Sequence, residues 1–146
     1  MLDQYPVILE QSVAWGDMDA YGHVNNVMYY RYIESSRILY FHKLGTYAQD
    51  VLTVIASNQC KYLKPVFYPD VLKVAARIEE IRNSAVRMHY VLYSEQQQQI
   101  VATAEAVVVF VDPVEMKKTL IPKQIRDDII RFEKKVNHDL NLGNNI

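Results

Sequence analysis

One long helical pattern followed by strand patterns constrains most strongly what this chain can fold into. Between Val27 and Leu44, apolar or small residues recur at steps of three and four, the spacing of one face of an α-helix. From Val51 to Asp112 the chain is rich in valine, isoleucine and tyrosine and reads as strand. A single long helix must therefore cover one face of a sheet, which predicts an α+β domain.

Short breaks separate the strand patterns, and this favours antiparallel pairing. The expected strands are Val51 to Tyr62, Val71 to Ile81, Ala85 to Tyr93 and Ile100 to Val111. Parallel strands need crossover connections of about a dozen residues or more, and these breaks are shorter. An earlier strand is expected from Pro6 to Trp15, with apolar residues in an imperfect period of two at Val7, Leu9, Val13 and Trp15. These patterns predict an antiparallel sheet of meander-like order.

The C-terminal part of the chain predicts a short second helix. Pro122 suits a first helical turn, where its missing N–H would be unpaired anyway, and the apolar stripe continues at Ile125, Ile129, Phe132 and Val136. We expect residues 1–136 to form one domain and residues 137–146 to form a loose polar tail. The valine run 107–109 predicts burial on both faces and hence a dimer that extends or covers the sheet.

Composition and charge limit the kinds of partner that this chain is expected to bind. The net charge of −1 comes from 16 basic and 17 acidic residues that are dispersed along the chain, which argues against nucleic acid as a partner. The sequence contains no stretch of the about 20 apolar residues that span a bilayer. Cys60 is the single cysteine, so an intrachain disulfide is excluded and a reducing compartment fits. We expect a cytoplasmic protein with no membrane partner.

Polar chemistry is concentrated in the segment Gly16 to Asn26, directly before the expected helix. Ten residues of this segment hold Asp17, Asp19, His23, Asn25 and Asn26. N–H groups at a helix start, with the positive end of the macrodipole behind them, can stabilise a developing oxyanion. A carboxylate beside them is ionised at neutral pH and can attack a carbonyl or activate water. This segment is the candidate active site.

The same segment resembles the signature of hot-dog thioesterases of the 4-hydroxybenzoyl-CoA thioesterase type. The resemblance is carried by Asp17-x-Asp19-Ala20-x-Gly22-His23-Val24-Asn25-Asn26-x-x-Tyr29, then Glu34 and Arg37. Further on, Tyr62-Leu63-Lys64-Pro65-Val66 and Tyr68-Pro69-Asp70 are similar to the family's connection between its second and third strands. The resemblance extends over most of the chain, from Pro6 to Phe132.

The resemblance implies a hot-dog fold, in which a five-stranded antiparallel sheet wraps around one long helix and a short C-terminal helix follows. It implies hydrolysis of a fatty-acyl or aromatic acyl-coenzyme A, with no metal and no cofactor. It also implies a homodimer or homotetramer with active sites at the dimer interface. Asp19 takes the place of the family's catalytic carboxylate, and a backbone N–H near Asn26 that of the group that polarises the thioester carbonyl.

Each remaining candidate has a structural interpretation beside the functional one. Asp17 is expected to hold the loop through backbone N–H groups, and His23 can either shuttle a proton or fix the turn. Both asparagines suit helix caps, and we prefer Asn26 for the catalytic site. Three residues are candidates for substrate binding, although Tyr29 can equally pack in the core: Asn25, Tyr29 and Lys64. Glu34 and Arg37 suit a surface or interface ion pair.

Two other functions stay open at this point. An acyl-thioester dehydratase or hydratase could use Asp19 and His23 to exchange a proton with a hydroxyacyl substrate. A non-catalytic acyl-CoA-binding module could keep the fold without turnover. The nucleophilic and the general-base role of Asp19 are both compatible with the sequence.

Overall fold

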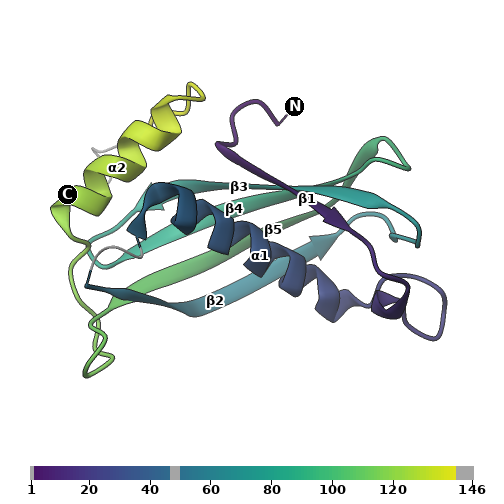
Figure 1. Cartoon of the computed structure of the whole chain (residues 1–146), viewed down its shortest axis with the longest axis horizontal. Coiled ribbons are helices and arrows are strands. Elements are labelled where there is room, and N and C mark those ends of the chain that lie inside the picture. The colour runs from purple at the N-terminus through teal and green to yellow at the C-terminus, as the bar shows by residue number, and fades with distance from the viewer. Residues whose placement is uncertain (1, 47–49, 141–146) are drawn as a thin grey trace.

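Five strands form one antiparallel sheet that curves around the long helix α1 (Figure 1). The computed structural model describes residues 2–46 and 50–140 of the 146-residue chain. The strands are β1 (Val7–Ser12), β2 (Leu52–Tyr62), β3 (Val71–Ile81), β4 (Ala85–Ser94) and β5 (Gln99–Val111). The helices are the 3-10 turn η1 (Trp15–Asp17), α1 (Asn26–Leu44) and α2 (Lys123–Lys134). This arrangement confirms the predicted α+β hot-dog fold.

The strands do not follow one another in space as they do along the chain. Their order in the sheet is β1-β3-β4-β5-β2, so the predicted meander is right for β3 to β5 but wrong for β2. The reason is α1, which follows β1 and carries the chain across the sheet before β2 begins. The strand β2 therefore lies at one edge, beside β5, and β1 lies at the other, beside β3.

The helix α1 packs its predicted face onto the sheet. The predicted stripe between Val27 and Leu44 has four buried members and one partly buried member, Leu44. The buried members are Tyr29, Ile33, Ser36 and Tyr40. The helix ends at Gly45, whose φ of 83° is a left-handed conformation that favours glycine. It contacts mainly β3 and β1. The edge strand β2 stays uncovered, and each of its residues except Cys60 is exposed.

The first strand is shorter than predicted, and Trp15 does not face the core. β1 ends at Ser12, and the Trp15 side chain is 72% exposed. The cause is a local turn: the Asp17 N–H donates to the Ala14 carbonyl oxygen, and the Ala14 N–H donates to Asp17 Oδ2, each over 3.0 Å. Alternation alone cannot reveal this turn, because it depends on a side chain that bonds to the backbone.

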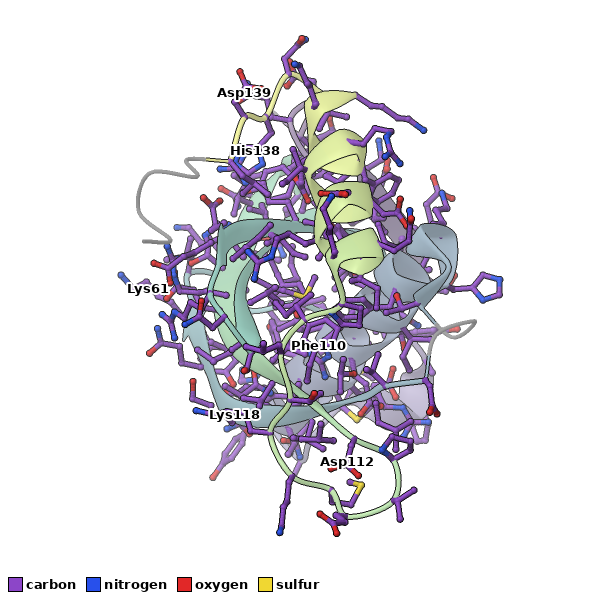
Figure 2. All side chains as sticks on the ribbon, turned by 90° about the vertical axis from the view of Figure 1, so that its left-hand side faces the viewer. Lys61, Phe110, Asp112, Lys118, His138 and Asp139 are labelled. Atoms are coloured by element: carbon purple, nitrogen blue, oxygen red, sulfur yellow. The ribbon has the colours of Figure 1, made fainter. Side chains whose placement is uncertain are left out.

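The helix α2 covers the end of β3 that β1 does not reach. β1 pairs with β3 only as far as Ala76, and beyond it the Ile78 N–H donates to the buried Glu133 carboxylate over 3.0 Å. The helix ends at Lys134, two residues earlier than the predicted stripe. Here Asn137 takes a φ of 59°, and its N–H donates to the Lys134 carbonyl oxygen. His138 follows directly and lies beside α2 (Figure 2).

The valine run 107–109 alternates between the two faces of β5. Val108 is fully buried in the core, whereas Val107 and Val109 are half-buried on the opposite face. Burial on both faces is therefore incomplete within one chain. Among the residues that the structure describes, no helix is both long and apolar enough to cross a membrane.

Candidate active site

Asp19 opens a tight turn that closes at His23. The Asp19 N–H donates to the His23 carbonyl oxygen over 2.8 Å, and the Gly22 N–H donates to the Asp19 carbonyl oxygen over 3.2 Å. Gly22 has a φ of 87°, which favours glycine at this point of the turn. Asp19 Oδ1 accepts from the Tyr21 N–H over 2.8 Å. One oxygen of the carboxylate therefore holds the turn.

The second oxygen of Asp19 is available for chemistry. Oδ2 lies 3.7 Å from His23 Nδ1, which is longer than a hydrogen bond, and the Asp19 side chain is 29% exposed. The His23 ring is fixed by neighbours: it stacks near Tyr21 and meets the edge of Phe67 at a centroid distance of 5.7 Å. A small movement would bring the imidazole into hydrogen-bond contact with the carboxylate.

The two asparagines at the helix start have different tasks. The Asn25 side chain caps α1, because its Oδ1 accepts from the Val27 N–H over 3.1 Å. Asn26 is the first residue of the helix and is exposed. Within the described residues its backbone N–H has no hydrogen-bond acceptor. A free N–H at the positive end of the helix is a donor of the kind that stabilises an oxyanion.

A cavity of about 370 Å³ brings most of the candidate residues together. Its walls come from the turn before α1, from the first turns of α1, and from the end of β2 with the loop that follows. It is lined by Asp19, His23, Val24, Asn26, Tyr29, Tyr62, Leu63, Lys64 and Pro65. The two loops are joined by the Val24 N–H, which donates to the Val66 carbonyl oxygen over 2.8 Å.

Five of the six residues named from the sequence thus line one cavity. Asp19, His23, Asn26, Tyr29 and Lys64 belong to it. The sixth residue, Asn25, is not among the residues that line the cavity, and its side chain is engaged in the helix cap.

Sequence reasoning missed Tyr62 and Leu63 as parts of the site. Both stand in the segment that resembles the family's second connection, but their approach to the helix start depends on contacts far apart in the sequence. The Tyr62 hydroxyl donates to the Asn26 carbonyl oxygen over 3.1 Å, across 36 residues. Its ring also meets Tyr29 edge-on, with centroids 4.8 Å apart.

Asp17 has the structural role that the sequence predicts for it. Its Oδ2 accepts from the Ala14 N–H over 3.0 Å and from the Tyr32 hydroxyl over 2.6 Å. Burial raises the pKa of Tyr32, and the neighbouring Asp17 carboxylate raises it further, so this hydroxyl keeps its proton and remains a donor. The carboxylate of Asp17 ties the loop to α1 and does not line the cavity.

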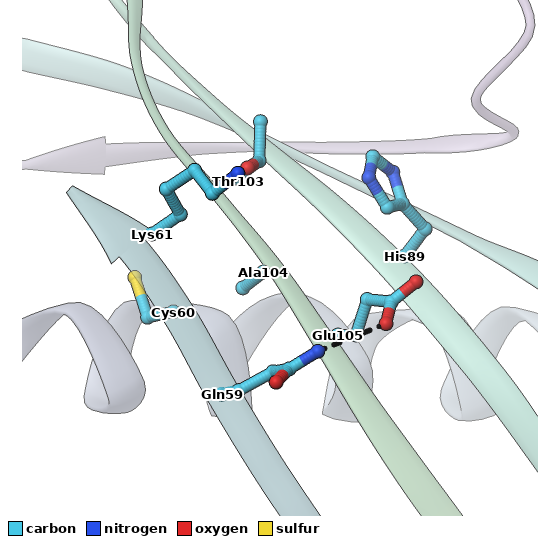
Figure 3. A pocket seen from close by; sticks show the side chains of 7 residues that line it. All are labelled: Gln59, Cys60, Lys61, His89, Thr103, Ala104 and Glu105. Carbon is cyan, nitrogen blue, oxygen red and sulfur yellow. Dashed lines mark hydrogen bonds between the residues drawn. The ribbon is translucent and has the colours of Figure 1, made fainter. Parts of the chain in front are cut away.

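A larger cavity of about 580 Å³ lies over β2, β4 and β5 and shares no lining residue with the cavity at the start of α1 (Figure 3). Side chains alternate along a strand, so Gln59, Thr103 and Glu105 face away from the core that buries Ala104. Three of its polar side chains are engaged in hydrogen bonds: Glu105 accepts from Gln59 and Arg87, and His89 Nδ1 contacts the Tyr5 hydroxyl at 2.8 Å. Size therefore does not make this cavity the site.

A sheet wrapped around one helix, with a carboxylate and a free N–H at the start of that helix, defines a protein of the hot-dog class. The chain belongs to the thioesterase-like superfamily, because a family model of that description matches residues 13–129. This match includes the whole of the candidate site.

Individual relatives agree with this assignment. Residues of the uncharacterized protein YsmA of Bacillus subtilis (strain 168) are 36% identical over 81 positions, which cover 54% of this chain and 55% of that protein. The chain thus spans just over half the length of this relative. The PA2801 protein of Pseudomonas aeruginosa, a putative thioesterase, is 30% identical, with a TM-score of 0.78 and coverage of 86% and 98%.

A third similar protein was solved with a ligand. The thioesterase from Thermus thermophilus, complexed with coenzyme A and zinc, has a TM-score of 0.81 and is 26% identical. The alignment covers 90% of this chain and 97% of that protein. The fold of the chain is therefore that of solved thioesterases over almost its whole length.

Proposed function

We propose that this protein hydrolyses acyl-coenzyme A thioesters to a free acid and coenzyme A. The observation that carries the proposal is that Asp19 and Asn26 line one cavity, while the backbone N–H of Asn26 has no acceptor among the described residues. A thioester needs these two groups, one to deliver a nucleophile and one to stabilise the oxyanion. Membership of the thioesterase-like superfamily supports the same reaction.

The reaction can be written through an activated water. Asp19 takes a proton from water, and the water oxygen bonds to the thioester carbon while the carbonyl electrons move onto its oxygen. The Asn26 N–H donates to that oxyanion. The oxyanion electrons then re-form the carbonyl bond while the carbon–sulfur bond breaks and the sulfur leaves with its bonding electrons. The proton held by Asp19 passes to the thiolate or to solvent. A thiolate leaves readily, so little acid assistance is needed.

The reaction can also be written through direct attack by Asp19. A carboxylate oxygen then bonds to the thioester carbon and expels the thiolate, which leaves a mixed anhydride that water hydrolyses. A single turnover in ¹⁸O-labelled water tests for direct attack. When water cleaves the anhydride at the Asp19 carboxyl carbon, the label enters the Asp19 side chain and the product acid keeps an unlabelled oxygen from Asp19. An activated water labels the product acid alone, so label in Asp19 identifies direct attack.

Lys64 is our candidate for binding the phosphates of coenzyme A. It is exposed and lines the cavity, and the backbone N–H groups of Leu63 and Lys64 both donate to the Val101 carbonyl oxygen, which fixes the base of this loop. The coenzyme A bound to the Thermus thermophilus protein supports a coenzyme A ester as the substrate. A reducing compartment suits the free Cys60, and we propose that the enzyme acts in the cytoplasm.

We also propose that two copies of the chain pair through β2, as a homodimer or as half of a homotetramer. The strand has a free edge 11 residues long, and such an edge pairs with another strand unless it is covered. Large apolar side chains are exposed along it, namely Leu52, Val54, Ile55 and Tyr62. Because the cavity lies at the end of the same strand, pairing through β2 brings the partner close to the site.

The proposal is tested by thiol release from a panel of short, long and aromatic acyl-coenzyme A esters. We expect at least one ester to turn over, and Asp19→Asn, which keeps the shape and removes the charge, to lose turnover at least about 100-fold. Asp17→Asn is the matched control, and any loss of activity in it should follow its loss of stability. A folded wild-type protein that releases no thiol from any ester would contradict the proposal.

An enoyl-coenzyme A added to this panel separates the second candidate function. Asp19 and His23 lie 3.7 Å apart, a spacing that also permits proton exchange with a hydroxyacyl or enoyl thioester. A hydratase changes the absorbance of an enoyl-coenzyme A without releasing thiol. A binding module does neither, yet it retains the ester on equilibrium dialysis.

A further inference from the structure

The side chain of Tyr62 links the last residue of β2 to the first residue of α1. Its hydroxyl donates to the Asn26 carbonyl oxygen over 3.1 Å. Its ring meets the Tyr29 ring at an interplanar angle of 89°, with centroids 4.8 Å apart, and Tyr29 is itself almost fully buried. Tyr62 is thereby held from one side by the core while its hydroxyl holds the exposed start of the helix.

This link matters because the exposed side of the first turn of α1 lies outside the main contacts of the helix. The helix packs mainly on β3 and β1, whereas Asn26 and Val27 in its first turn are exposed. The first N–H groups of a helix have no intrahelical acceptors, so the first turn is its least constrained part. Asn25 fixes the Val27 N–H from the loop side, and Tyr62 fixes the Asn26 carbonyl from the sheet side.

The hydroxyl of Tyr62 is suited to a permanent donor role. Burial raises the pKa of Tyr62, and Cys60 and Tyr30 raise it further, so the proton stays on the oxygen at neutral pH. A tyrosine hydroxyl that stays protonated donates one hydrogen bond without changing its charge. The hydroxyl can therefore donate to the Asn26 carbonyl oxygen at neutral pH.

We infer that Tyr62 is a positioning residue of the thioesterase site, which holds the first turn of α1 so that the Asn26 N–H faces the carbonyl of a thioester beside Asp19. This inference rests on the proposed function. Tyr62 acts through Asn26 and not on the reacting atoms. An oxyanion donor contributes most when it is fixed in advance, and a displacement of about 1 Å can cost up to about 100-fold in rate.

Tyr62→Phe tests the inference, because it removes the hydroxyl and keeps the ring. We expect kcat to fall about twofold to tenfold, the range expected for one hydrogen bond, with KM unchanged because the ring still forms the cavity wall. Tyr93→Phe is the matched control: Tyr93 lies on β4, and its hydroxyl donates to the exposed Gln98 side chain over 3.1 Å. We expect wild-type kinetics from it.

Amide hydrogen exchange measures the positioning itself and does not depend on turnover. The Val27 N–H donates to Asn25 Oδ1 and the Met28 N–H donates to the Asn25 carbonyl oxygen, so both amides report on the first turn. We expect both to exchange faster in Tyr62→Phe than in the wild type, and at the wild-type rate in Tyr93→Phe.

The two measurements separate failure of this inference from failure of the proposed function. Unchanged exchange at Val27 and Met28 in Tyr62→Phe overturns the positioning role at any level of activity. If Val27 and Met28 exchange faster in Tyr62→Phe but its kcat equals that of an active wild type, only the importance of Tyr62 for catalysis is overturned. A wild type that releases no thiol contradicts the proposed function, and the catalytic role of Tyr62 falls with it.

Discussion

The Tyr32 hydroxyl donates a hydrogen bond over 2.6 Å to Asp17 Oδ2, and thereby ties the loop before α1 to the buried face of that helix. Tyr32 is 2% exposed, and the same oxygen of Asp17 also accepts from the Ala14 N–H. The two aspartates of the loop therefore have different roles. Asp17 fixes the backbone, which leaves Asp19 one oxygen for chemistry.

We expect Tyr32→Phe to destabilise the fold. The hydrogen bond is made to a carboxylate in a protected place, so its loss should lower the free energy of unfolding by about 1.5–3 kcal/mol. Urea unfolding measures this change directly. The change Tyr93→Phe removes an exposed hydrogen bond and should have a much smaller effect. Equal stabilities of the two variants would show that the Tyr32 contact does not hold the loop.

The two asparagines should respond to alanine in opposite ways. Asn25→Ala removes the helix cap and should cost about 1 kcal/mol of stability. Asn26→Ala keeps the backbone N–H that serves the oxyanion but removes a side-chain amide that lines the cavity and can orient the attacking water, so stability should hold and kcat should fall modestly. Thermal unfolding and thiol release, measured on both variants, test whether Asn25 caps the helix and Asn26 serves catalysis. Loss of stability confined to Asn26→Ala would reverse the assignment of the cap.

Periodicity was sufficient to predict most of the fold. The spacing of apolar residues along the chain indicates which face of each strand or helix is buried, as the stripe from Tyr29 to Tyr40 illustrates. The end of β1 was predicted wrongly because the Asp17 turn overrides the alternation at Trp15. The place of β2 at the sheet edge was missed because strand order is a property of the whole chain.

The contacts of single polar residues were harder to predict. The expected surface pair of Glu34 and Arg37 is wrong for this chain, because Arg37 is 8% exposed and donates to the buried Tyr90 hydroxyl. The interface alternative stays a prediction. His138, which belongs to the polar tail expected from residue 137 onward, contacts Glu133 at 2.7 Å. Arg37 and Tyr90 belong to elements far apart in the sequence, so spacing along the chain carries no sign of their contact. The contact of His138 with Glu133 is local but depends on the left-handed turn at Asn137 that ends α2.

The buried carboxylate of Glu133 should give the protein a characteristic dependence on pH. It accepts from the Tyr40 hydroxyl over 2.5 Å and from the Ile78 N–H, and its other oxygen contacts His138, which also lies 3.9 Å from Glu79. Burial raises the pKa of Glu133 above its ordinary value of 4.5, and the three donors oppose this in part. The folded protein thus holds this proton more tightly than the unfolded chain.

Stability from this proton is present at low pH and is lost as the pH rises through the folded pKa. We therefore expect the wild type to lose free energy of unfolding relative to Glu133→Gln as the pH rises from about 4.5, the ordinary carboxyl value, until the folded pKa is passed. Urea unfolding of both proteins at a series of pH values measures the difference. Parallel curves would mean that Glu133 titrates alike in both states.

Pairing through β2 predicts that one charge on its edge will separate the protomers. Ile55 is 40% exposed on β2, so Ile55→Lys should place a charge in the apolar contact between two copies. We expect the wild type to sediment at twice the 17.0 kDa mass of the chain or at a higher multiple, and the variant to sediment at a lower mass. Sedimentation equilibrium provides the measurement.

Val114→Lys is the control for this change. Val114 is 88% exposed in the loop between β5 and α2 and is not a residue of β2, so a lysine there adds the same charge without replacing a side chain of the proposed contact. Its mass and its turnover should equal those of the wild type. Because the cavity lies at the end of β2, the separated Ile55→Lys protomers should also lose thiol release. A monomeric wild type with full turnover would exclude β2 pairing as a requirement of the site.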